Sequence, residues 1–386
     1  MKKKLPKLSF NYIAAAFLFL FFSFFSRPCK AAWLRNQFEG VRPLGMGNAF
    51  LAIADDKNAL WYNPAGLAFI KDSRLDFNDF ILGGDSIDTV ERIQRAALRG
   101  EVNSLWRKDT QMGRVGFFPA YYGPHFGVSA YYSAFGFSEV DNFDGEEVDI
   151  YAVSDLGVLA SAGMPFHKNF SGGISLRGMA RKGIDKTQNG LALARALGIT
   201  QAQLANSLYS NLWPSAKLGY GFGVNAGLLW RLPRPRLSFA ATAEDIGHTN
   251  FKGIDGGTPP PPIRGTYHFG MAMTFPLKRG NSLQVALDFH HLLERVIFVK
   301  QTHLGVEWTS GMFSLRAGLN QGYLTTGFSF NTDFVRVAFS THATELGNSL
   351  WERSHRWYQA QLVFGAPLSK VKPTGRAQSF KGIRER

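Results

Sequence analysis

The sequence predicts an all-β fold, an antiparallel transmembrane β-barrel of about 14 strands. Three observations lead to this prediction. Segments that alternate between apolar and small or polar residues recur along the chain, the joints between them alternate between short and long, and the chain begins with a secretion signal.

The segment 217–230 shows the alternation most clearly. Apolar residues from Leu218 to Trp230 occupy every second position, and glycine fills most of the positions between them. Side chains on a strand alternate between its two faces, so one face is apolar and the other is nearly bare. A tilted strand crosses the ~25 Å hydrocarbon band in roughly 9 to 11 residues. We therefore expect the apolar face to contact lipid and the glycine face to line the lumen.

Residues 1–31 are predicted to be a cleaved signal peptide. Four lysines precede an apolar run over 13–25, which is shorter than the ~20 residues of a transmembrane helix. The small residues near Ala31 suit signal peptidase, so we expect cleavage there and delivery to the bacterial outer membrane. An uncleaved anchor is the alternative. Lipidation of Cys29 is disfavoured because Arg and Pro replace the small residues that should precede it.

Most of the basic charge lies at the two ends of the chain. The formal net charge is +14, but it is +8 without residues 1–31, and residues 369–386 contribute +5 of that. The nearly neutral remainder argues against a nucleic-acid-binding surface. Because the single cysteine belongs to the signal peptide, the mature chain has no disulfide and no thiolate metal site, and we expect no cofactor. We assign residues 367–386 to a basic periplasmic tail, either a plain extension or a docking segment.

The alternating segments and their joints give the strand count. Counted from a periplasmic N-terminus, the periplasmic joints are short and the outer joints are mostly long, apart from Gln321-Gly322. The first two segments are irregular: Asp79 interrupts the alternation, and Pro119 removes a ladder donor, which is tolerated near a rim or bulge. The segments are 74–82, 114–122, 125–137, 149–164, 171–181, 217–230, 236–244, 266–275, 283–290, 302–308, 313–320, 323–330, 334–342 and 357–364.

Three outer loops are expected to have structure of their own. Apolar residues at helical spacing predict short amphipathic helices over 190–209 and around 87–98, either packed on the rim or forming a hydrophobic landing groove. Pro259 to Pro262 form a stiff polyproline stretch that leads back to the next strand.

The segment before the first strand carries the most specific motif. It reads RPLGMGNAF over 42–50 and NALWYNPAGLA over 58–68. These residues closely resemble the N-terminal signature of the FadL-like outer-membrane proteins. That family includes transporters of long-chain fatty acids and aromatic hydrocarbons, and the PorV-like proteins of a secretion system. The runs 287–290, 303–307 and 315–323 resemble the PorV-like branch in particular.

The resemblance implies a fourteen-stranded barrel over 74–366, inside which residues 32–73 fold as a hatch. Glycines permit tight turns beside the wall, and an Asn-Pro pair can start a short helix. A nucleotide-binding function of the glycines is disfavoured, since the third glycine of that fingerprint is missing. The hatch and gating residues implied are Gly45, Gly47, Asn63, Pro64 and Gly66.

Polar residues opposite the apolar stripes form a second candidate set. They are expected either to form a structural ladder or to hold the hatch or a ligand head group such as a carboxylate. His290 and His291 are not expected to bind a metal, because adjacent residues on a strand point to opposite faces. The set comprises Asp288, His290, Glu307, Arg316 and Arg336, with His342.

Two non-enzymatic functions remain open. One is transport of a hydrophobic solute through a hatch-gated barrel, and the other is a PorV-like surface scaffold or shuttle for exported proteins. Catalysis is not expected, because only strand parity brings Ser314 and Ser340 toward the possible bases His303 and His342. Expected partners are outer-membrane lipids, the hydrophobic solute, the barrel-assembly machinery and, for a scaffold, a secreted protein. A continuous apolar path favours transport, and a polar, occluded lumen favours the scaffold.

Overall fold

The computed structural model describes residues 34–85, 110–140, 147–189, 216–234, 236–254, 257–347 and 349–368. The predicted signal peptide, the loop helices over 190–209 and 87–98, and all but the first two residues of the basic tail lie outside the described residues. Within this part of the chain, no helix is long and apolar enough to cross a membrane.

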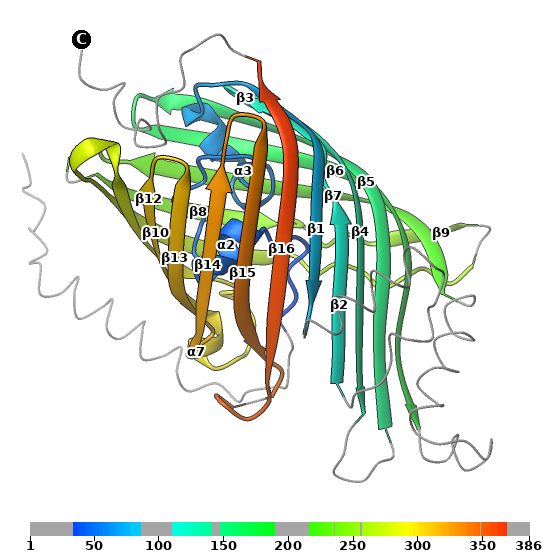
Figure 1. Ribbon diagram of the computed structural model, residues 1–386. Coiled ribbons are helices and arrows are strands. Elements are labelled where there is room, and N and C mark those ends of the chain that lie inside the picture. The colour runs from blue at the N-terminus through cyan, green and yellow to red at the C-terminus, as the bar shows by residue number, and fades with distance from the viewer. Residues whose placement is uncertain are drawn as a thin grey trace, which may run out of the picture.

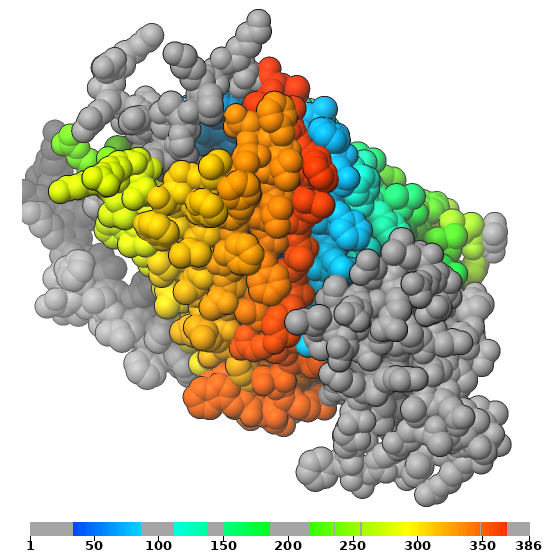
Figure 2. All heavy atoms as spheres, viewed as in Figure 1, coloured from blue at the N-terminus to red at the C-terminus, as the bar shows by residue number. Residues whose placement is uncertain are grey.

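The described strands form one closed antiparallel barrel (Figure 1). The last strand pairs with the first, from Arg74↔Pro367 to Gly84↔Tyr358, and the two lie side by side on the surface in Figure 2. Fourteen wall strands result, because β2 and β3 are two parts of one strand and β9 pairs only with β7. The strands are β1 Arg74–Gly84, β2 Thr110–Phe117, β3 Ala120–Gly123, β4 Phe126–Val140, β5 Glu147–His167, β6 Phe170–Asn189, β7 Lys217–Arg231, β8 Leu237–Glu244, β9 Phe251–Gly253, β10 Thr266–Pro276, β11 Ser282–Phe289, β12 Thr302–Ser310, β13 Phe313–Asn320, β14 Tyr323–Asn331, β15 Val335–Glu345 and β16 Ser354–Pro367.

The predicted fold class is confirmed, and the alternation has the expected cause. Along β7 the apolar side chains face outward, with Phe222 74% exposed, while Gly219, Gly221 and Gly223 are buried on the lumen face. Each of the fourteen predicted segments lies on a wall strand, although several strands extend beyond the predicted ends. Long strands such as β5, with 21 residues, project beyond the width that a hydrocarbon band requires.

The wall is irregular where the first two strands meet. The strand predicted over 114–122 is interrupted at Phe118 and Pro119, as the proline suggested. At the same level, β1 has a bulge between Asp76 and Asn78 in its pairing with β16. A bulge adds one residue and reverses the alternation beyond it, so Asp79 faces the lumen rather than breaking a pattern. We call this region, the bulge of β1 and the interruption between β2 and β3, the wall break.

The N-terminal segment lies inside the lumen (Figure 1). Its helices are α2 Val41–Gly45, α3 Ala59–Tyr62 and the 3₁₀ helix η1 Pro64–Phe69. Helix α2 packs against β13, β14 and β15, while η1 packs against β5, β6 and β7. The main apolar core therefore lies inside the barrel, between this segment and small inward-facing wall residues. The short helices η4 Lys278–Gly280 and α7 Phe298–Gln301 lie in a turn and a loop.

Candidate functional site

The signature glycines bring the N-terminal segment against the wall. Gly47 has φ of 65°, and a Cβ there would lie 2.3 Å from the carbonyl oxygen of Leu304. Its N–H donates to Thr325 Oγ1 at 2.9 Å. A Cβ on Gly66 would lie 2.1 Å from the carbonyl oxygen of Ala54. A residue with a side chain at either position collides with backbone, which explains why glycine is required there.

Asn63 and Pro64 join the segment to the opposite wall. Asn63 Oδ1 accepts from the N–H of Ala65 at 3.1 Å and caps η1, which begins at Pro64. Its Nδ2 donates to the carbonyl oxygens of Leu51 and Leu228, at 3.0 and 3.2 Å. One side chain thus links two parts of the N-terminal segment to β7. The sequence predicted a helix start here, and the structure adds the contact with the wall.

Arg42 is the centre of a buried ion-pair network. It donates from Nε and Nη2 to the two carboxylate oxygens of Glu307, at 2.9 and 2.6 Å. Its Nη1 lies 2.5 Å from Asp55 Oδ1 and 2.8 Å from Asp56 Oδ2. Arg316 donates to the same Glu307 at 2.6 Å. Glu307 and Arg316 were predicted lumen residues. Arg42 was noticed only as part of a motif, because nothing local indicates a partner 265 residues away.

The other predicted lumen residues do not join this network. Asp288 accepts from the N–H groups of Phe50 and Leu51, at 2.6 and 2.8 Å, and so holds the N-terminal segment at a second point. Arg336 forms an ion pair with Asp76 at the wall break. The set expected as one polar cluster is therefore divided among separate contacts with the segment and the wall.

Four histidines gather beside the segment. His290 and His291 follow the end of β11, and the φ of 54° at His291 lets both rings enter the lumen. They lie against His268, whose ring centroid is 4.8 and 5.3 Å from theirs, and His303 lies 4.2 Å from His290. The expectation that the two adjacent rings face opposite ways was wrong, since neither residue belongs to a strand. No group of three metal-ligating side chains able to hold a metal occurs among the described residues.

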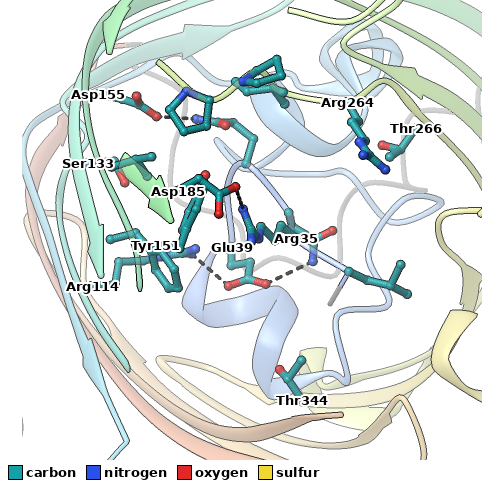
Figure 3. A pocket seen from close by; sticks show the side chains of 18 of the residues that line it. Arg35, Glu39, Arg114, Ser133, Tyr151, Asp155, Asp185, Arg264, Thr266 and Thr344 are labelled. Atoms are coloured by element: carbon teal, nitrogen blue, oxygen red, sulfur yellow. Dashed lines mark hydrogen bonds and ion pairs between the residues drawn. The ribbon is translucent and has the colours of Figure 1, made fainter. Parts of the chain in front are cut away.

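A cavity of about 440 Å³ lies between the segment and the ends of the strands that carry the long loops, and Figure 3 shows side chains that line it. Residues 34–39 cross its floor. One side is aromatic, formed by Phe135, Tyr151 and Trp357. The guanidinium of Arg35 lies 3.6 Å from the centroid of the Tyr151 ring. Arg35 also forms an ion pair with Asp185 at 3.6 Å, so the cavity offers an apolar wall beside a paired cation.

Two further pairs of opposite charge line the cavity. Arg181 donates to both oxygens of Asp155, each at 2.7 Å. Arg114 lies 3.0 Å from Glu39, a pair visible in Figure 3. The pairing ties the floor of the cavity to β2, because Glu39 belongs to the N-terminal segment. A ligand here meets a neutralised polar rim rather than a field of one sign.

An aromatic cluster joins the floor of the cavity to the wall break. Phe38, whose two chain neighbours line the cavity, stacks on Trp61 with ring centroids 4.7 Å apart. Its ring meets Phe118 edge to face at 5.0 Å, and Phe118 is the residue that leaves the wall between β2 and β3. Tyr131 on β4 lies 4.9 Å from Trp61. We call these four residues the aromatic latch.

The fold is that of solved outer-membrane channels. The match to the toluene transporter TodX of Pseudomonas putida has a TM-score of 0.53 and 12% sequence identity. It covers 87% of this chain and 100% of the TodX chain. Two further matches have lower scores: the monoaromatic hydrocarbon channel CymD (0.49, 11% identity, 85% and 97% coverage) and a Pseudomonas aeruginosa FadL homologue (0.42, 12%, 86% and 98%). No protein-family model matches the chain, and no curated protein matches it. The expected FadL-like resemblance is confirmed at the level of the fold.

Proposed function

We propose that the protein transports hydrophobic solutes across the outer membrane, of the long-chain fatty-acid or hydrocarbon type. The solute enters the cavity at the outer end, and the N-terminal segment acts as the hatch. The solute then leaves sideways through the wall break. The observation that carries the proposal is the aromatic latch, which connects the cavity floor to the wall break by contacts between aromatic rings.

The two routes out of the cavity differ in what closes them. Along the barrel axis, the network around Arg42 and the contacts of Asp288 close the lumen. Separating a buried ion pair costs about 3–5 kcal/mol, because it leaves charges without partners. Ring contacts contribute about 0.5–1.5 kcal/mol each beyond the area they bury. An apolar solute replaces ring contacts with contacts of the same kind as far as Phe118. The sideways route is closed by ion pairs only at the wall break, those of Lys57 with Asp79 and of Arg336 with Asp76.

The cavity supports the class of solute. Its aromatic side buries an apolar chain or ring, and the cation at its edge, Arg35, already has an ion-pair partner in Asp185, so the cavity favours the apolar part of a solute. The match to TodX, whose title names a toluene transporter, agrees with this class without extending to a particular solute.

Cross-linking the latch tests the route. The mature chain is expected to lack cysteine, so F38C/F118C introduces two unique thiols that a short, reducible bis-methanethiosulfonate can bridge. We expect cross-linking to abolish uptake of labelled oleate or toluene by cells, and reduction to restore it. The matched control is F166C/F170C, an aromatic pair with ring centroids 5.9 Å apart at a turn, where cross-linking leaves uptake unchanged. Undiminished uptake with a bridged latch contradicts the sideways route.

The polar, closed lumen axis favours one alternative, a scaffold or shuttle for exported proteins. Native mass spectrometry with lipid extraction separates the two functions. Protein purified from its own membrane in mild detergent is expected to carry fatty acids or hydrocarbons in near-stoichiometric amount. A ligand-free cavity together with a retained protein partner would favour the scaffold.

A further inference from the structure

Five basic residues lie along one arc of the short-turn end of the barrel, the periplasmic end in barrels of this kind. They occupy the three successive turns that join β5 to β6, β7 to β8 and β10 to β11. The same turns contain no Asp or Glu. None of the five has an ion pair with a described residue. The residues of this basic arc are Lys168, Arg234, Arg236, Lys278 and Arg279.

Each turn of the basic arc follows an outward-facing aromatic residue. Phe166 is 67% exposed, Trp230 is 47% exposed and Phe275 is 42% exposed. Aromatic side chains on the outer surface of a barrel mark the level where hydrocarbon gives way to head groups. The basic residues come two to six positions later in the chain, beyond that level. The cations therefore lie at the depth of lipid phosphates, around the perimeter of the barrel rather than over its lumen.

The single sign of the charge distinguishes this arc from the rest of the molecule. Elsewhere at the same end, Lys71 is followed by Asp72, and the turn between β14 and β15 carries Asp333. At the other end, the charges around the cavity are of both signs and include pairs such as Arg114 with Glu39. Among the described residues, only the basic arc places several cations without an ion-pair partner in successive turns. Such an arc attracts anions, and the attraction weakens as salt is added.

We propose that the basic arc binds the phosphate groups of anionic phospholipids in the inner leaflet of the outer membrane. The aromatic residues fix the depth of the barrel in the bilayer. At that depth the cations of the arc contact the lipid phosphates. Arg supplies a forked donor that matches phosphate, and Lys supplies a point charge. The turns of the basic arc lie between β5 and β11 in the order of the wall. The wall break, between β1 and β4, is therefore not part of the arc. This proposal is independent of the solute that the barrel carries.

Lipid retention measured by native mass spectrometry tests the proposal. Full-length protein is incubated in mild detergent with equal amounts of phosphatidylglycerol and phosphatidylethanolamine, and retained lipids are counted. We expect an excess of the anionic lipid of about tenfold, falling toward equality as salt rises to about 0.5 M. The salt titration uses the unaltered protein, so it stands even where a variant does not fold.

Two variants with the same change of charge locate the effect. K168Q/R234Q/R236Q/K278Q/R279Q is expected to retain both lipids equally. The control K217Q/K252Q/R295Q/R353Q/R356Q removes five charges at the opposite end and is expected to keep the preference; its residues are all exposed. Both variants are first checked for folding by gel electrophoresis, in which a folded barrel migrates differently before and after heating. Equal retention by the unaltered protein, or equal loss of preference in both variants, overturns the proposal, as does displacement of the bound lipid by inorganic phosphate alone.

Discussion

Asp79 and Phe118 meet at the wall break, where the N–H of Phe118 donates to the carbonyl oxygen of Asp79 at 2.8 Å. The side chain of Asp79 forms an ion pair with Lys57 of the N-terminal segment and accepts from Gln361 Nε2 of β16 at 2.7 Å. One residue thus contacts the segment, the interrupted strand and the closing strand. Movement of the segment is therefore mechanically linked to the wall at the position of the proposed exit.

The first prediction concerns the ion pair between Lys57 and Asp79. D79N leaves the buried Lys57 without its partner while keeping an oxygen for Gln361, so we expect a loss of about 3–5 kcal/mol in the free energy of unfolding. K57M/D79N removes both charges and is expected to recover much of that loss. Urea titration in detergent micelles, run as a double-mutant cycle, gives the coupling energy. Additive losses in the double variant would show that the pair is not coupled.

The exposed Asp72 offers a control for that cycle, because D72N removes the same charge seven residues earlier in the chain and Asp72 has no ion pair with a described residue. We expect it to change the free energy of unfolding by less than about 0.5 kcal/mol. A loss comparable with that of D79N would mean that the net charge, and not the buried pair, controls stability.

The second prediction concerns Arg42, which holds the segment to the wall. R42M removes the cation that Glu307, Asp55 and Asp56 share and leaves Glu307 paired with Arg316 alone, so the segment should leave the lumen more often. The readout is maleimide labelling of A49C, because Ala49 is fully buried. Each 1.4 kcal/mol lost multiplies the open population by about ten, so we expect labelling to accelerate by at least about tenfold. The exposed R234M is the matched control, with no acceleration expected.

The walls of the barrel were predictable because alternation is local. Strand faces follow from period two, and turn residues mark strand ends, so 217–230 and β7 agree within one residue at the C-terminal end. The bulge in β1 was not predictable in the same way. It has no composition signature, yet it reverses the face of every residue after Phe77, and Asp79 was read as an irregularity for that reason.

The contacts inside the barrel depend on distant parts of the chain. The pairing of Arg42 with Glu307 spans 265 residues, and strand parity alone places Glu307 inward without naming its partner. Likewise, parity predicted the opposite directions of His290 and His291 only on the assumption that both belong to a strand. The signature motif located the segment, but its specific contacts needed three-dimensional information.

The third prediction uses two glycines of β6. A Cβ on Gly173 would lie 2.3 Å from the N of Ala65, so G173A pushes η1 off the wall. A Cβ on Gly178 would meet only the ring of Phe222, at 3.4 Å, which is an ordinary contact. We expect G173A to lower the free energy of unfolding by about 1–3 kcal/mol and G178A to leave it nearly unchanged. Urea titration of both variants decides the matter, and equal stability of the two would contradict a close fit between η1 and β6.

The fourth prediction concerns acid. The pKa of His291 is lowered to about 3, mainly by burial and also by the nearby His303. With its hydrogen on Nε2, the ring donates to Asn36 Oδ1 at 3.0 Å and so holds the floor of the cavity in its neutral form. The pKa in the unfolded chain is 6.5. As the pH falls below 6.5, the unfolded chain binds a proton before the folded one, so the free energy of unfolding should decrease from there down to about pH 3.

The urea midpoint is therefore expected to fall between about pH 7.5 and about pH 5, by an amount that corresponds to roughly 1.4 kcal/mol per unit for one such group. H291Q keeps an N–H donor for Asn36 but does not titrate, so its midpoint should depend less on pH. H167Q changes an exposed histidine at the end of β5 and should keep the full dependence. Identical pH profiles for all three proteins would mean that the buried histidine does not contribute to the acid sensitivity, and that other buried groups, His290 among them, carry it.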